Sequence, residues 1–309
     1  MSQRTSQQAS RASLRRRLLL IAAAALVAVG GAVYLSGAVD GPSTVAAGSN
    51  KNLPRAEFPE PGVVHVHGLG VDPGDGTLYA ATHSGLFQLP ATGKAVRIAN
   101  RYQDTMGFTV TGPGEFLGSG HPDFREDNPP RLGLIESTDQ GQTWVPLSLR
   151  GEADFHTLHA AHGNVYGYES GSGTFMVSAD RKKWDRRAQL PMRDFAVSPD
   201  SPDVLLATTE QGLARSGDGG RTFAPVSGAP VLAVLSWAAT DVLYGVAPDG
   251  AVHRSTDGGT AWTRQGNVGG EPEAMAFDLR AEALYVAVDD RGVLVSTDGG
   301  KTFTTRYVD

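Results

Sequence analysis

The chain has 309 residues, a formal net charge of −6 at pH 7 and no cysteine. Without cysteine it has neither disulfides nor a lipid-modified cysteine anchor. The acidic balance argues against nucleic acid as a partner. About 250 residues remain beyond the N-terminal segments, enough to bury a core without cross-links.

The N-terminus has the pattern of an export signal. Residues 1–17 carry five arginines and no acidic residue, and residues 18–39 are apolar without a single charge. Such a run crosses a ~30 Å hydrocarbon core at ~1.5 Å per residue. We expect a basic cytoplasmic tail at 1–17, a transmembrane signal anchor at 18–39 and a single-pass cell-membrane protein whose C-terminal domain is extracytoplasmic. Alternatively, 18–39 is a cleaved signal peptide and the protein is secreted.

Residues 40–60 are small, polar and proline-containing, which is typical of a flexible linker. Residues 61–309 form the folded domain in this interpretation. Its runs of alternating or apolar residues are short and separated by glycine-containing turns, so the expected fold class is all-β.

An eight-residue phrase recurs through this domain at 137–144, 216–223, 255–262 and 296–303, with a worn copy at 178–184. In chain order its aspartates are Asp139, Asp180 (in the worn copy), Asp218, Asp257 and Asp298. The steps between them are 41, 38, 39 and 41 residues. A period near 40 in an all-β chain predicts the blades of a propeller. The aspartate should cap a tight turn, and the glycines supply positive φ.

The number of blades follows from a second repeated feature. A glycine opens a short apolar strand at Gly85, Gly133, Gly173, Gly212, Gly250 and Gly292, and two strand-like runs precede each. We therefore expect six blades of four strands, with each aspartate turn between the third and fourth strand. The first strand should be innermost (63–71) and the last outermost (303–308), so that the ring closes by blade-on-blade packing. The longer step from Gly85 to Gly133 contains an inserted loop at 121–130.

With this phrase the chain resembles the Asp-box, or BNR-repeat, β-propellers, which include sialidases and sortilin-like receptors. It is also similar to exported bacterial propellers labelled glycosylhydrolase-like. The resemblance covers roughly residues 60 to 309 and implies a fold more firmly than a function. In relatives of this kind the aspartate turn is structural.

Histidines are concentrated at one rim of the predicted ring. His65 and His67 begin the first strand of blade one, His83 ends its second strand, His121 ends the second strand of blade two, and His156 begins blade three. Residues two apart on a strand project from the same face. Imidazole suits Cu, Zn or Fe, so one hypothesis is a transition-metal site at His65, His67, His83, His121 and His156. The alternative is that these histidines cap strand ends with hydrogen bonds or fill the interfaces between blades. Further candidate ligands on this rim are Asp104, Met106, Asp123, Asp154 and Glu169.

The main functional expectation is a membrane-tethered binding module for a metal ion or an envelope protein. A glycoside hydrolase is the alternative. The resemblance to sialidases would require an arginine triad and a Phe/Tyr-Arg-Ile-Pro segment in blade one, but that stretch reads Gly-Val-Val-His-Val-His-Gly at 62–68. A different glycosidase would use a pair of carboxylates on the rim, drawn from Asp123, Glu126, Asp127, Asp154 and Glu169.

Overall fold

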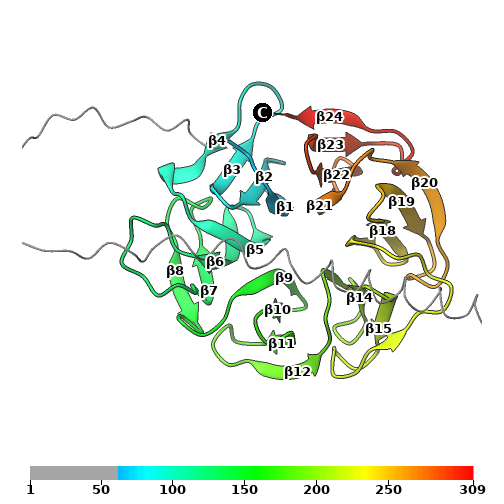
Figure 1. The fold of residues 1–309 in the computed structure, drawn as a ribbon, viewed down its shortest axis with the longest axis horizontal. Helices are drawn as coiled ribbons and strands as arrows, with labels where there is room; N and C mark the ends of the chain where they lie inside the picture. Colours follow the sequence, from blue (N-terminus) through cyan, green and yellow to red (C-terminus); the bar gives the residue numbers. More distant parts are fainter. Residues whose placement is uncertain (1–61, 309) are drawn as a thin grey trace, which may run out of the picture. The chain divides into compact units, whose positions relative to one another are not determined.

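A computed structural model describes residues 62–308. They form six four-stranded antiparallel sheets arranged as the blades of a ring (Figure 1). The all-β, six-bladed propeller expected from the repeats is therefore confirmed. The predicted tail (1–17), membrane segment (18–39) and linker (40–60) all lie outside the described residues. Within 62–308, no element is a helix of the length and apolarity that a bilayer crossing needs.

Each sheet uses four consecutive strands, so every blade is a meander. The first three blades contain β1 (Val66–Val71), β2 (Leu78–Thr82), β3 (Gly85–Leu89) and β4 (Val96–Arg97); β5 (Asp104–Gly112), β6 (Glu115–His121), β7 (Leu134–Ser137) and β8 (Val145–Ser148); and β9 (Phe155–Ala161), β10 (Asn164–Glu169), β11 (Thr174–Ser178) and β12 (Asp185–Gln189). A short 3-10 helix, η1 (Ile98–Asn100), follows β4.

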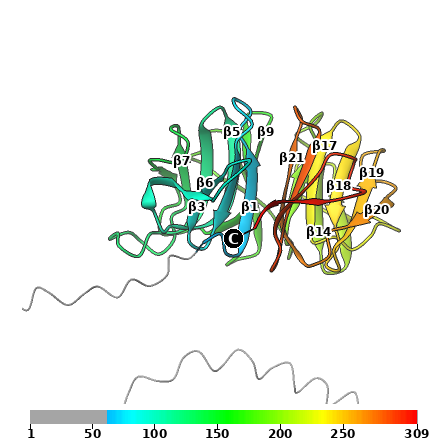
Figure 2. The same ribbon diagram turned by 90° about the horizontal axis from the view of Figure 1, so that it is seen from above.

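The other three blades contain β13 (Phe195–Val197), β14 (Leu205–Thr209), β15 (Gly212–Ser216) and β16 (Ala224–Pro225); β17 (Val234–Ala239), β18 (Val242–Val246), β19 (Ala251–Ser255) and β20 (Thr263–Asn267); and β21 (Pro272–Asp278), β22 (Ala283–Val288), β23 (Gly292–Ser296) and β24 (Thr304–Tyr307). The first strand of each blade is innermost in the ring (Figure 1), and Figure 2 shows the same ring turned by 90°.

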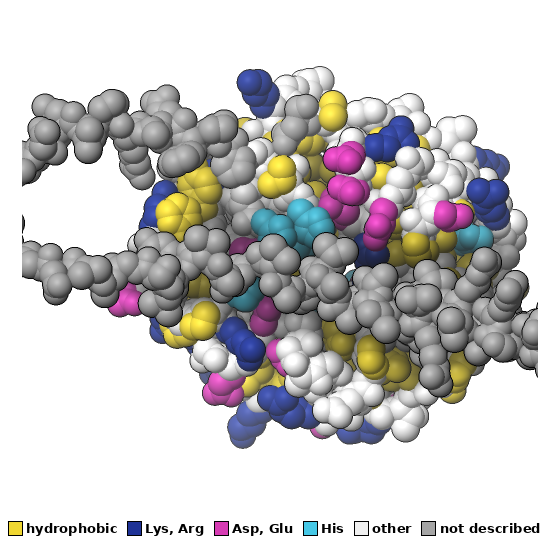
Figure 3. All heavy atoms as spheres, in the orientation of Figure 1, with side chains coloured by type: hydrophobic (Ala, Val, Ile, Leu, Met, Phe, Trp, Pro, Cys, Tyr) yellow, Lys and Arg dark blue, Asp and Glu magenta, His cyan; other side chains and the backbone are white. Residues whose placement is uncertain are grey.

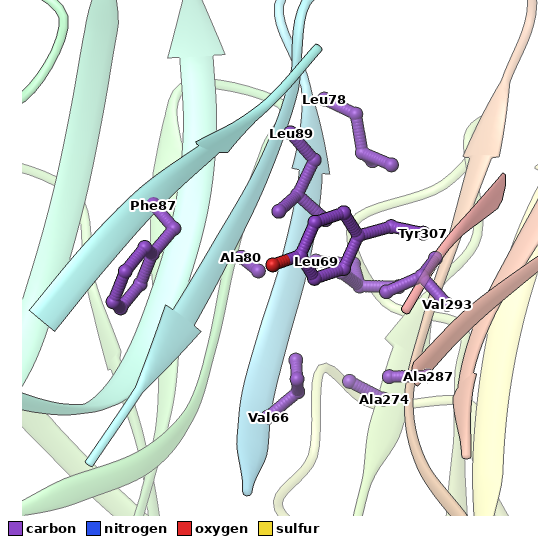
Figure 4. Packing of buried hydrophobic residues seen from close by; sticks show 10 residues of the cluster. All are labelled: Val66, Leu69, Leu78, Ala80, Phe87, Leu89, Ala274, Ala287, Val293 and Tyr307. Carbon is purple, nitrogen blue, oxygen red and sulfur yellow. The ribbon is translucent and has the colours of Figure 1, made fainter. Parts of the chain in front are cut away.

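The hydrophobic core is divided among the six interfaces between neighbouring blades. Each of the six clusters of buried side chains combines residues from two adjacent blades. The cluster between blades one and six joins Leu69 and Leu89 to Val293 and Tyr307, and Figure 4 shows the Tyr307 ring beside Leu69. The ring thus closes by packing, as expected, because no sheet contains strands from both ends of the chain.

The repeated phrase forms the turn between the third and fourth strands. In the turn after β7, Ser137 Oγ donates to Asp139 Oδ1 at 2.8 Å, and the Thr143 amide and hydroxyl donate to Asp139 at 2.9 and 2.6 Å. The same bonds from serine and from the following backbone recur at Asp218, Asp257 and Asp298. Hydrogen bonds to the charged form hold the pKa of these carboxyls below the ordinary range.

The second glycine of the phrase also serves the packing between blades. Gly220 has φ +83°, and a Cβ there would lie 2.2 Å from the Phe175 ring of the preceding blade. Only glycine permits both this backbone conformation and this approach.

Candidate functional site

A polar channel of about 270 Å³ runs along the ring axis, lined by the inner strands and by residues at their entrances. At one mouth of the channel, Figure 3 shows histidine side chains beside a group of acidic side chains. The residues concerned stand where β1, β5, β9 and β21 begin.

β-Bulges turn specific side chains at this mouth. The pairing of each of these four inner strands with its neighbour skips one residue close to its start. The skipped residues are His67, Met106, His156 and Glu273. Bulges redirect side chains and are over-represented beside functional sites. The residues two positions earlier are His65, Asp104, Asp154 and Glu271, so two equivalent positions in four blades supply most of the polar groups.

Four side chains from blades one and two lie together and are called the first cluster: His65, His67, His83 and Asp104. His67 Nε2 lies 3.1 Å from His83 Nδ1, His83 Nδ1 lies 2.9 Å from Asp104 Oδ1, and His67 Nε2 lies 3.6 Å from Asp104 Oδ1. A nitrogen of His65 lies within 4.8 Å of the ligand nitrogens of the other two histidines. The His65 and His83 rings stack with centroids 4.9 Å apart.

His65 reaches this cluster in a way that strand periodicity does not describe. It precedes β1, with φ +51°, a left-handed conformation uncommon for residues other than glycine. Its Nδ1 lies 2.9 Å from Glu273 Oε1, while Glu273 Oε2 accepts the Val66 amide at 3.1 Å. Glu273 therefore holds both the ring of His65 and the backbone that follows it.

The first cluster keeps a neutral imidazole at its centre. Burial, followed by the neighbouring His83 and His65, lowers the pKa of His67 to about 3. Removal from water disfavours the charged form of an imidazole. His67 therefore retains a nitrogen lone pair at neutral pH, which is the form that binds metals.

His121 and His156 do not join His65, His67 and His83; they form a second cluster with Asp154. His156 Nε2 and His121 Nε2 lie 3.1 and 3.5 Å from Asp154 Oδ2. The two clusters are adjacent, because Asp104 and His121 are directly paired across β5 and β6. The five predicted histidines thus occupy one rim but gather at two points.

Two other predicted ligands hold loops in place. Asp123 Oδ1 accepts the Arg125 amide and Nε at 2.9 and 2.8 Å, and its Oδ2 accepts the Tyr102 amide at 2.8 Å. The Arg125 guanidinium keeps the pKa of Asp123 far below its usual range. Glu169 accepts the amides of Gly171 and Ser172 at 3.1 and 2.8 Å. Both carboxylates are nearly fully buried and already hydrogen-bonded.

Sequence reasoning missed Glu273. It occupies the same bulged position in blade six as His67 does in blade one, an equivalence that appears only in the strand pairing of the folded protein. Arg193 extends from blade four to blade six, where it donates to Glu271 Oε1 at 3.0 Å and to the Pro272 carbonyl at 2.7 Å.

Comparison with known proteins identifies the fold. No protein-family model and no curated protein sequence matches the chain. Among solved structures it is similar to a gluconolactonase from Xanthomonas campestris, with 13% identity over 76% of this chain and 86% of the other, at a TM-score of 0.60. It is also similar to YCF48 from Cyanidioschyzon merolae (13% identity, 77% and 96% coverage, TM-score 0.52) and to the WD40 propeller domain of Doa1 (12%, 78% and 81%, TM-score 0.54). At these identities the likeness establishes the β-propeller fold and no activity.

Proposed function

We propose that this protein is a binding module for a transition metal ion, Cu, Zn or Fe, held by the first cluster at the mouth of the propeller. His67 Nε2, His83 Nδ1 and Asp104 Oδ1 are the ligand atoms, and His65 completes the set. Residues 18–39 would tether the module to the cell membrane with the propeller outside the cytoplasm.

The observation that carries the proposal is the mutual spacing of these three atoms, 3.1, 2.9 and 3.6 Å. A metal bound tetrahedrally at about 2.0–2.1 Å would separate its ligand atoms by roughly 3.3 Å. Nδ1 of His83 faces both His67 Nε2 and Asp104 Oδ1, so the three atoms form a triangle of potential ligands. A cation at the centre would satisfy all three atoms.

Glu273 supports this assignment from outside the ligand set. A ligating imidazole commonly donates its other N–H to a carboxylate, which fixes its tautomer and orientation. Accepting the Nδ1 proton of His65 at 2.9 Å, Glu273 leaves the Nε2 of that ring unprotonated. Two histidines and a carboxylate are ligands that Zn, Cu and Fe accept.

The test is metal binding by the full-length chain, purified in detergent without a polyhistidine tag and stripped with a chelator. Titration with Zn²⁺ and with Cu²⁺ should show tight uptake. A variant combining His67→Ala with His83→Ala should lose at least about 100-fold in affinity at this site, whereas His253→Ala, a histidine of β19 in blade five, should bind like the wild type. If the wild-type chain takes up neither ion, the proposal is wrong.

A protein partner in the envelope is a second candidate, favoured by the loop at 121–130. Phe124 is 79% exposed at the tip of this loop, and its ring lies 5.9 Å from that of Tyr102, over which Arg125 stacks. Exposed aromatic and arginine side chains are enriched in protein interfaces. Loss of a crosslinked partner in Phe124→Ser, with metal uptake unchanged, would support this second role.

Hydrolysis of glycosides is the less supported alternative. Of the carboxylates considered for it, Asp123 and Glu169 are engaged in the loop contacts described above, and Glu126 pairs with Arg101 at 2.8 Å. A catalytic pair requires one protonated and one ionised carboxyl group at the substrate. Asp123 and Glu169 have pKa values lowered by their hydrogen bonds, although burial acts the other way, which suits neither of them to the role of the acid.

A further inference from the structure

The second cluster, His121, Asp154 and His156, is a separate group of ligand atoms beside the first. Its imidazoles come from the end of β6 and the start of β9, on neighbouring blades. Both Nε2 atoms approach the same oxygen, Asp154 Oδ2, at 3.5 and 3.1 Å. The bulge in β9 that skips His156 turns this ring toward the rim.

The protonation of His121 is determined by the inserted loop. His121 Nδ1 lies 2.7 Å from the carbonyl oxygen of Pro130. Because a carbonyl can only accept, Nδ1 carries the proton and Nε2 of the neutral ring carries a lone pair. That lone pair stands 3.5 Å from a carboxylate oxygen. Two acceptors facing each other repel unless a positive charge lies between them.

Asp154 also lacks hydrogen bonds that a buried carboxylate needs. The residue is only 8% exposed, and its Oδ1 is buried with no hydrogen-bond partner among residues 62–308. Buried polar atoms are normally satisfied, and a buried carboxylate normally pairs with a cation or binds a metal. His156 alone, at 3.1 Å from the other oxygen, supplies a single donor.

We propose that the second cluster is a second transition-metal site, with His121 Nε2, His156 Nε2 and Asp154 as ligands. The inference shares with the proposed function only the class of metal. The two imidazoles are partly exposed and can turn toward a common ion, while the buried carboxylate stays in place. Since Asp104 of the first cluster pairs across the strands with His121, the rim would hold two ions side by side.

Stoichiometry tests this directly in the full-length, chelator-stripped chain. With Zn²⁺ followed by calorimetry and elemental analysis, the wild type should bind two equivalents. His121→Ala combined with His156→Ala should bind one, as should His67→Ala combined with His83→Ala, and the fourfold variant should bind none. With two equivalents of Cu²⁺, electron paramagnetic resonance should show dipolar coupling between the ions in the wild type and in neither double variant.

The outcomes separate the two proposals. One equivalent in the wild type, unchanged by His121→Ala with His156→Ala, would overturn the second site and leave the first. If the wild type binds one equivalent and each of the two double variants binds none, a single ion uses both clusters. That result also overturns a separate second site. No uptake by the wild type would overturn both. Circular dichroism spectra matching the wild type would show that the variants are folded.

Discussion

Oε1 of Glu273, in the last blade, lies 2.9 Å from Nδ1 of His65, which directly precedes the first strand of the first blade. The other oxygen of Glu273 accepts a hydrogen bond from the backbone amide of Val66 at 3.1 Å. These contacts join residues 207 and 208 positions apart in the chain. They connect the closure of the ring to the orientation of a candidate ligand. The packing of the last blade against the first therefore also positions His65 in the first cluster.

Replacing Glu273 should weaken metal binding without removing a ligand. In Glu273→Gln, one oxygen and one amide group replace two acceptors, so either His65 or Val66 loses its partner. Loss of such an outer carboxylate typically costs about 10–100-fold in metal affinity. Zn²⁺ titration of the full-length chain measures it. Glu271→Gln is the matched control, since its carboxylate is 60% exposed and its ion pair with Arg193 should contribute little. Equal affinity in both variants would contradict the role given to Glu273.

The metal-free protein should lose stability in mild acid. Burial, against a weaker opposing hydrogen bond at Phe195, lowers the pKa of His159 to about 4, compared with about 6.5 in an unfolded chain. Between these values only the unfolded chain takes up the proton. The stabilisation is complete above pH 6.5 and is lost as the pH falls toward 4, at up to about 1.4 kcal/mol per pH unit. His67 adds to the loss in the same range.

Urea unfolding in chelator at pH 7.5, 6.5, 5.5 and 4.5 would measure this slope. His159→Leu should reduce it by the contribution of one proton, and an unchanged slope would show that His159 titrates normally. The Leu side chain can occupy the place of the imidazole against Phe195, whose ring centroid lies 5.1 Å from that of His159.

Asp194 should act in the opposite direction. Burial at the channel raises its pKa to about 7, even though its oxygens accept the Leu235 and Phe195 amides. The folded protein therefore binds a proton that an unfolded aspartic acid releases near pH 3.8. Its stabilisation is complete below that pH and declines as the pH rises to 7, by an amount on the order of 2–4 kcal/mol. Asp194→Asn should abolish this decline in urea unfolding between pH 5 and 8, although the amide costs a constant amount by losing one acceptor. A decline that persists in the variant would contradict the assignment.

Close approach between blades two and three should make Gly107 irreplaceable. A Cβ at Gly107 would lie 2.5 Å from the backbone oxygen of Phe155, which cannot move without separating β5 from β9. Gly107→Ala should cost about 1–3 kcal/mol of unfolding free energy. Gly217→Ala, at a position where nothing lies within 4 Å, should change it by less than about 0.5 kcal/mol. Comparable losses in both variants would argue against this packing.

Local chemistry explains why so much of the fold could be predicted. The aspartate turn makes its hydrogen bonds within seven residues of sequence, from Ser137 to Thr143 in one copy. Each copy of the phrase therefore predicts the same hairpin. The glycines at Gly85 and its equivalents mark the third strands. The number of blades, the order of strands in each blade and the placement of the histidines on one rim follow from the spacing of these turns and glycines.

Only the tertiary structure decided how the rim residues meet. Alternation along a strand predicted that His65 and His67 share a face, but His65 precedes β1 with positive φ and His67 stands in a bulge. Bulges arise from the pairing of one strand against its neighbour, and the bond to Glu273 arises from ring closure. Neither leaves a local signal in the sequence. The amino-acid sequence alone thus determined the blades and the candidate ligands. Cross-strand register and packing between blades decided that those ligands form two clusters.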